Sequence, residues 1–84
     1  MKGILLTSKS VTYAQRMAKT LERSGISAQI VRPDTELTKG SCAYAVNISQ
    51  TFLPEAIEVL KANKLFPIRV ILVERERVYR EIRI

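Results

Sequence analysis

A helical repeat near the N-terminus is the sequence pattern that most restricts how this chain folds. Apolar side chains recur every three to four residues from Val11 to Ser24, and polar side chains occupy the opposite face. Gly25 follows directly, and glycine commonly ends a helix because it adopts the left-handed conformation without steric cost. The pattern predicts an amphipathic helix over residues 11–24, with an apolar stripe of Val11, Ala14, Met17, Ala18 and Leu21.

Four short apolar segments outside this helix have the composition and alternation typical of strands. They cover residues 3–7, 26–31, 42–48 and 68–73. A second helix is predicted from Pro54, which suits a first helical turn, to about Asn63. The connection over residues 32–41 is long, and we expect one helical turn at Pro33–Leu37 within it.

The charged tail over residues 74–84 fits two patterns. Val78, Ile82 and Ile84 have strand spacing, whereas Ile71, Arg75, Val78 and Ile82 also have helical spacing. No Gly or Pro separates the tail from the strand before it. We therefore expect the tail to stay extended, and to pair with a second protomer.

The predicted order of elements is β-α-β-β-α-β, which matches the split βαβ arrangement of ferredoxin-like folds. Connection rules then favour a two-layer α+β fold, with a four-stranded antiparallel sheet and both helices on one face. A length of 84 residues predicts a single domain over residues 1–84. The opposite sheet face would carry Leu5, Val31, Ala43 and Ala45, an apolar surface of the kind that dimerisation often covers.

The residue counts exclude several kinds of site. One Cys and no His leave too few ligands for a zinc site and no Ser-His-Asp or Cys-His pairing. We therefore expect no metal and no cofactor, and favour a carrier or binding protein over an enzyme. A single Cys also excludes an internal disulfide, and the apolar run Ile4–Leu6 is too short for a signal peptide or membrane span. These features predict a soluble, cytoplasmic protein.

Cys42 is the residue whose chemistry depends most on the predicted topology. In a split βαβ unit the start of the third strand lies beside the end of the first strand, where the first helix begins. A helix N-terminus stabilises anions and lowers the pKa of a thiol. The positive charge of Lys39 and an anion nest at the loop backbone would add to this effect. The residues expected to support the thiolate are Ser8, Lys9, Ser10, Lys39, Gly40 and Ser41. The alternative is a small buried thiol, which is the commonest environment of a free Cys.

Several short segments resemble a known family when they are taken in order. They are Gly3–Leu6, Ser8–Ser10, Ser24–Ile26, Pro33 with Leu37, Ser41–Cys42, Ala43–Ala45 and Val78–Arg80. Together they resemble the small bacterial and archaeal selenium/sulfur carrier-like family, a domain of unknown function. The family usually has Gly after the cysteine, where this chain has Ala43.

The resemblance implies that Cys42 is a carrier thiol. It would accept a sulfane sulfur or selenium atom from a donor persulfide, such as that of a cysteine desulfurase, and pass it to an acceptor enzyme. This chemistry needs one accessible thiolate and no general base, which suits a chain with one Cys and no His.

Two other functions fit the sequence. The first is a basic module that binds RNA or protein, because the net charge is +6. Its cations would be Arg16, Lys19 and Arg23 on the helix and Arg75, Arg77, Arg80 and Arg83 in the tail. The tail cations alternate with glutamates, however, and Tyr44 is alone in the middle strand. The second is a dimeric regulatory domain with no chemistry at Cys42.

Overall fold

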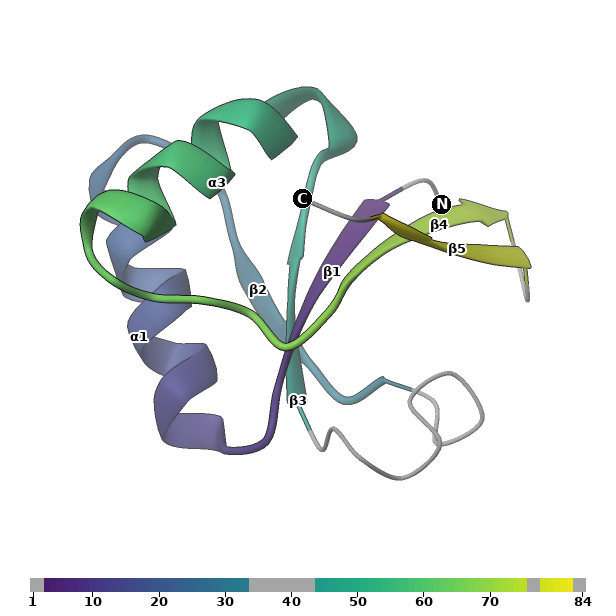
Figure 1. Cartoon of the computed structure of the whole chain (residues 1–84), viewed down its shortest axis with the longest axis horizontal. Helices are drawn as coiled ribbons and strands as arrows, with labels where there is room; N and C mark the ends of the chain where they lie inside the picture. Colours follow the sequence, from purple (N-terminus) through teal and green to yellow (C-terminus); the bar gives the residue numbers. More distant parts are fainter. Residues whose placement is uncertain (1–2, 34–43, 76–77, 83–84) are drawn as a thin grey trace.

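Two helices cover one face of a five-stranded sheet in the part of the chain that the computed structural model describes, residues 3–33, 44–75 and 78–82 (Figure 1). The strands are β1 (Gly3–Ser8), β2 (Gln29–Val31), β3 (Tyr44–Ile48), β4 (Val70–Arg75) and β5 (Val78–Ile82). The helices are α1 (Val11–Arg23) and α3 (Leu53–Ala62), and the short 3-10 turn η1 (Gln50–Phe52) precedes α3.

The sheet is antiparallel throughout, in the order β2-β3-β1-β4-β5. Strand β3 lies between β1 and β2 and is antiparallel to both. The order of β2, β3, β1 and β4 is the one expected for a split βαβ arrangement. The predicted α+β class, the order of elements and the helices on one face are therefore found in the structure.

The prediction of a four-stranded sheet is wrong, because the tail adds a fifth strand. After β4 the chain reverses, and β5 pairs with β4 so that Val70 lies opposite Ile82. Arg80 Nη2 and Glu74 Oε1 lie 2.7 Å apart across this hairpin. Without β5, the outer edge of β4 would leave N–H and C=O groups unpaired, and a hairpin supplies their partners within the same chain. The tail is extended, as expected, and its partner in the structure is β4. Pairing of the tail with a second protomer stays a prediction.

The C-terminal end of α1 sets where β2 begins. Gly25 has φ +83°, and its N–H donates to the Glu22 carbonyl at 3.0 Å. The N–H of Ile26 donates to the Leu21 carbonyl at 2.9 Å, which completes a Schellman turn and directs Ile26 into the core. The backbone of Ile26 is used in this turn, so the strand predicted over residues 26–31 pairs only from Gln29 onward.

Alternate residues of the strands separate two apolar clusters. The larger cluster lies under the helices and includes Ile4, Leu6, Val46, Ile48 and Val70 from the sheet, Ala14, Met17, Ala18 and Leu21 from α1, and Ala56 and Leu60 from α3. The smaller cluster, on the other face, consists of Leu5, Ala45 and Ile71, with Val31 and Val73 packed against it. The prediction that Leu5, Val31 and Ala45 share this face is confirmed.

Some predicted features fall outside the described residues. These are most of the helical turn expected at Pro33–Leu37, the strand positions 42 and 43, and the last two residues of the tail. In the described part, no helix has both the length and the apolar character needed to cross a membrane.

Candidate functional site

The turn between β1 and α1 is built by two serines. The Ser8 hydroxyl donates to the Ser10 carbonyl oxygen at 2.7 Å and accepts from the Ser10 N–H at 3.2 Å. Ser8 is 1% exposed, so water does not compete for these bonds. The hydroxyl proton of Ser8 is therefore used within the turn, where it fixes the path of the chain from the sheet into the helix.

Ser10 is the N-cap of α1. Its backbone is extended, with φ −128° and ψ 148°, and its Oγ accepts from the Tyr13 N–H at 3.1 Å. The cap satisfies one of the N–H groups that the first turn of a helix leaves without an internal partner. The remaining N–H groups and the positive end of the helix dipole face the end of the sheet at which β1 finishes.

Replacing Ser10 with Ala should lower the free energy of unfolding by about 1 kcal/mol, because the Tyr13 N–H loses its acceptor. Urea unfolding followed by circular dichroism would measure the change. Ser10→Asp retains an acceptor at the cap and should stay within about 0.5 kcal/mol of the wild type. An equal loss in both variants would show that the cap does not stabilise α1.

The start of β3 lies beside this turn. Tyr44 is the partner of Ser8 in the β1–β3 register, and Cys42 precedes Tyr44 by two residues in the sequence. The guanidinium carbon of Arg32 lies 5.4 Å from the centroid of the Tyr44 ring, a cation–π distance. Arg32 is not among the site residues predicted from the sequence. Its position could have been inferred from the topology. Arg32 follows β2 directly, and the end of β2 lies at the same end of the sheet as the start of β3.

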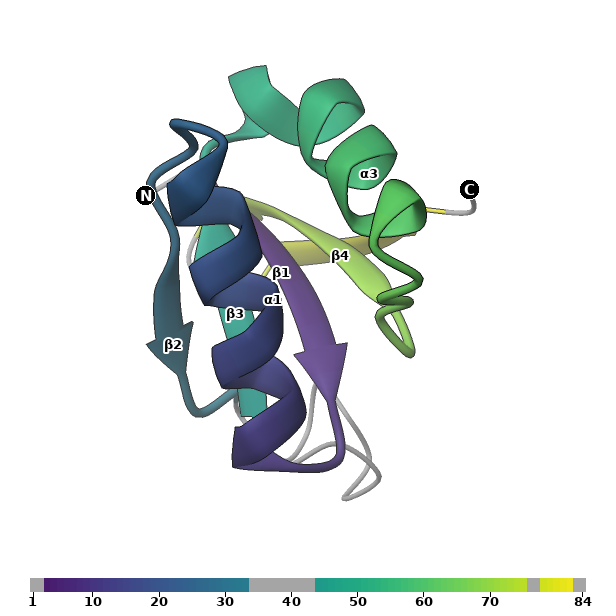
Figure 2. The same cartoon turned by 90° about the vertical axis from the view of Figure 1, so that its left-hand side faces the viewer.

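The connection between α3 and β4 also reaches this end of the sheet (Figure 2). The Phe66 N–H donates to the Tyr13 hydroxyl at 2.6 Å, and the Ile68 N–H donates to the Thr7 carbonyl at 2.9 Å. Phe66 is 59% exposed, Ile68 48% and Val11 38%. The end of the sheet where Ser8, Ser10 and Tyr44 meet therefore carries exposed apolar side chains, which the sequence analysis also missed.

The structure describes only part of the predicted site. Ser8, Lys9 and Ser10 lie together in the turn before α1, and Lys9 is exposed. The other predicted positions lie outside the described residues, and their contacts stay predictions: Lys39, Gly40, Ser41 and Cys42. Among the described residues, no group of three or more His, Cys, Asp or Glu side chains is placed to hold a metal ion.

Residues 3–73 match the model of the family described as "Putative Se/S carrier protein-like". The chain belongs to this family. The match runs from β1 into β4 and includes Cys42, so the resemblance seen in the sequence is confirmed over most of the chain. It stops before β5 and the Val78–Arg80 segment. No curated protein and no solved structure matches the chain significantly.

Proposed function

We propose that the protein carries a sulfur or selenium atom on the thiol of Cys42. The observation that supports this function is the family match, whose range includes the only Cys of the chain. A carrier needs a thiolate that a partner protein can reach, and needs neither a metal nor a general base.

The transfer is an exchange between thiolate and persulfide. The Cys42 thiolate attacks the terminal sulfur of a donor persulfide, a new S–S bond forms at Cys42, and the donor S–S bond breaks. The electron pair of that bond leaves with the donor as its thiolate, so the sulfur keeps its oxidation level and no further oxidant is required. Attack by an acceptor thiolate on the terminal sulfur of the Cys42 persulfide reverses these roles. A terminal selenium atom would move by the same steps.

The described residues around the start of β3 support a stabilised thiolate. Tyr44, which follows Cys42 by two residues, lies opposite Ser8. Strand β3 therefore begins beside the N-terminus of α1. Lys9 and Arg32 add positive charge at the same end of the sheet. Helix N-termini and nearby cations favour the thiolate over the thiol. We propose that these groups lower the pKa of Cys42.

The exposed apolar side chains at this end suit contact with other proteins. Val11, Phe66 and Ile68 are each at least 38% exposed, and apolar side chains gathered on one part of a surface often mark an interaction site. We propose a protein donor of the cysteine desulfurase type and an acceptor enzyme as the partners. Incubation with a cysteine desulfurase and cysteine, followed by measurement of the intact mass, tests the proposal. A gain of one sulfur atom on Cys42 is expected.

The pH dependence of alkylation reports the state of the thiol separately from transfer. We expect the alkylation rate of Cys42 in the folded protein to have a midpoint below ~8.5, the value of a free thiol. Lys9→Gln should raise this midpoint. Lys19→Gln removes the same charge roughly 14 Å along α1 from its N-cap Ser10, where salt screens it more strongly, and should change the midpoint less than Lys9→Gln does. A thiol that reacts only after unfolding would instead indicate a buried structural Cys.

A further inference from the structure

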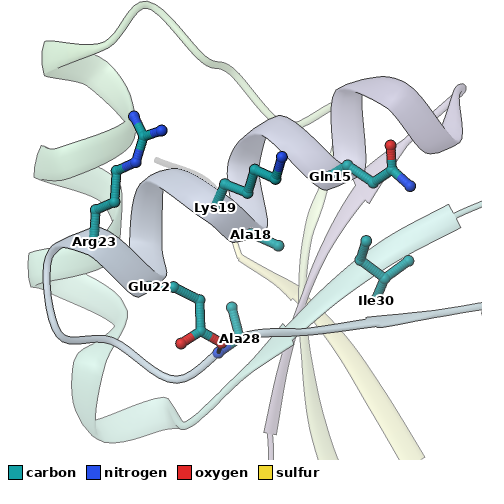
Figure 3. A pocket seen from close by; sticks show the side chains of 7 residues that line it. All are labelled: Gln15, Ala18, Lys19, Glu22, Arg23, Ala28 and Ile30. Carbon is teal, nitrogen blue, oxygen red and sulfur yellow. Dashed lines mark hydrogen bonds between the residues drawn. The ribbon is translucent and has the colours of Figure 1, made fainter.

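A groove runs between α1 and β2, the edge strand of the sheet (Figure 3). It is an open groove with a volume of about 680 Å³, and its apolar surface comes from Ala18 on α1 and from Ala28 and Ile30 on the opposite wall. Ile30 is 39% exposed, one of few large apolar side chains with that much exposure in the described part of the chain. The groove therefore combines an apolar floor with access from solvent.

The outer edge of β2 borders this groove. In the described residues β2 pairs only with β3, through the register Gln29–Asn47, Ile30–Val46 and Val31–Ala45. Alternate residues of an antiparallel strand direct their N–H and C=O groups away from the neighbouring strand. An edge strand of this kind offers main-chain donors and acceptors to an added strand.

The charges on the α1 wall select the partner. Lys19 and Arg23 line the groove at its rim, and both are exposed. Lys19 extends along α1, whereas Arg23 turns away from β2 (Figure 3). Glu22 is the one carboxylate among the described residues that line the groove, and its Oε1 accepts from the Ala28 N–H at 3.2 Å. The charged lining residues therefore comprise two cations and one anion, and this net positive charge favours an anionic partner, while the apolar surface accepts apolar side chains.

Two other occupants fit these features less well. A second copy of this chain, paired through β2 about a two-fold axis, would present the same net positive groove lining to its partner, and like charges oppose association. A single-stranded nucleic acid gains much of its affinity from stacking on aromatic rings, and none of the described lining residues is aromatic.

We propose that the groove between α1 and β2 binds an extended, acidic segment of a partner protein, which adds to the sheet as a strand beside β2. Its main chain pairs with the edge of β2 that no strand of the described residues occupies, and an apolar side chain lies over Ala18, Ala28 and Ile30. Its Asp or Glu side chains face Lys19 and Arg23. This binding does not involve Cys42, so its test is independent of the test of the carrier function.

Selection of displayed random short peptides on the immobilised full chain tests the proposal. We expect the enriched peptides to alternate apolar residues with Asp or Glu. Their affinity should fall about tenfold or more for Lys19→Glu/Arg23→Glu. The control Lys61→Glu/Lys64→Glu changes the net charge equally outside the groove and should retain binding. Ile30→Asp should also lose binding, whereas Val11→Asp, at a site of equal exposure, should not.

Hydrogen exchange separates strand addition from docking by side chains alone. A bound peptide should slow amide exchange within Gln29–Val31, because an outward N–H gains a main-chain acceptor. The proposal is overturned if no peptide is enriched, if the enriched peptides bind both charge-reversal variants equally, or if exchange in β2 is unchanged. Displacement of the peptide by a single-stranded RNA that binds the groove with higher affinity would overturn it in favour of a nucleic-acid site.

Discussion

Cys42→Ser should abolish the loading of sulfur from a cysteine desulfurase. The chain has one Cys, so the variant has no thiolate to attack the donor persulfide, and a Ser hydroxyl is not ionised at neutral pH. The intact mass after incubation with desulfurase and cysteine should remain that of the unmodified protein. The wild type should gain one sulfur atom, which a reducing agent removes.

The unfolding free energy of the same variant distinguishes a carrier thiol from a core residue. An accessible Cys42 should tolerate Ser with a change within about 0.5 kcal/mol, as at other surface positions. A buried Cys42 would leave a hydroxyl without a partner, at a cost of about 1–3 kcal/mol. A large loss of stability together with no loading in the wild type would contradict the carrier function.

A thiol moved by one residue provides the matched control. The double variant Cys42→Ser/Ser41→Cys restores the thiol count but shifts the sulfur along the chain. If the surroundings of position 42 activate the thiolate, this variant should load more slowly than the wild type. Equal loading would show that any thiol in this segment suffices, and that the proposed activation by α1 is wrong even though transfer occurs.

Leu6→Ala should cause one of the larger losses of stability that a single apolar truncation produces in this chain. Leu6 is 0% exposed and belongs to the cluster between β1 and the helices. Truncation of a fully buried Leu to Ala costs about 2–5 kcal/mol, because contacts are lost and the cavity collapses only in part. For a domain of 84 residues this is a large share of a total stability of roughly 5–10 kcal/mol. Denaturant unfolding would measure it.

Two further truncations place this value in context. Ile68 is 48% exposed, and Ile68→Ala should cost less than about 1 kcal/mol. Leu5 points to the other face of the sheet and is 8% exposed, so Leu5→Ala should also cost about 2 kcal/mol or more. A cost for Leu6→Ala no larger than that for Ile68→Ala would contradict the packing of β1 under the helices.

Local patterns predicted the elements that depend on local physics. The stripe from Ala14 to Leu21 and the glycine at position 25 gave the range of α1 to within one residue, because helix periodicity and a left-handed end are encoded in neighbouring residues. The two faces of β3 followed from alternation in the same way, and β1 followed from a continuous apolar run. The shorter range of β2 could not be predicted from alternation, because the backbone of Ile26 is used to end the helix.

The candidate site was predicted in part. The topology correctly placed the start of β3 beside Ser8, because the strand order of a split βαβ unit leaves little choice. Arg32 and the exposed side chains of Phe66 and Ile68 were missed, since they reach this end of the sheet from elements distant in sequence.

The C-terminal tail is a part of the fold whose pairing the sequence alone did not determine. The sequence by itself determined that the chain has one thiol and no His, and that its elements follow the order β-α-β-β-α-β. Val78 and Ile82 fit both a strand and a helix, and the absence of Gly or Pro after β4 favoured an extended tail without identifying the strand that it pairs with. The tertiary structure decided it, because the free edge of β4 offered backbone partners that only an extended chain can use. The groove between α1 and β2 also depends on the tertiary structure, because it forms only when the helix and the edge strand pack together.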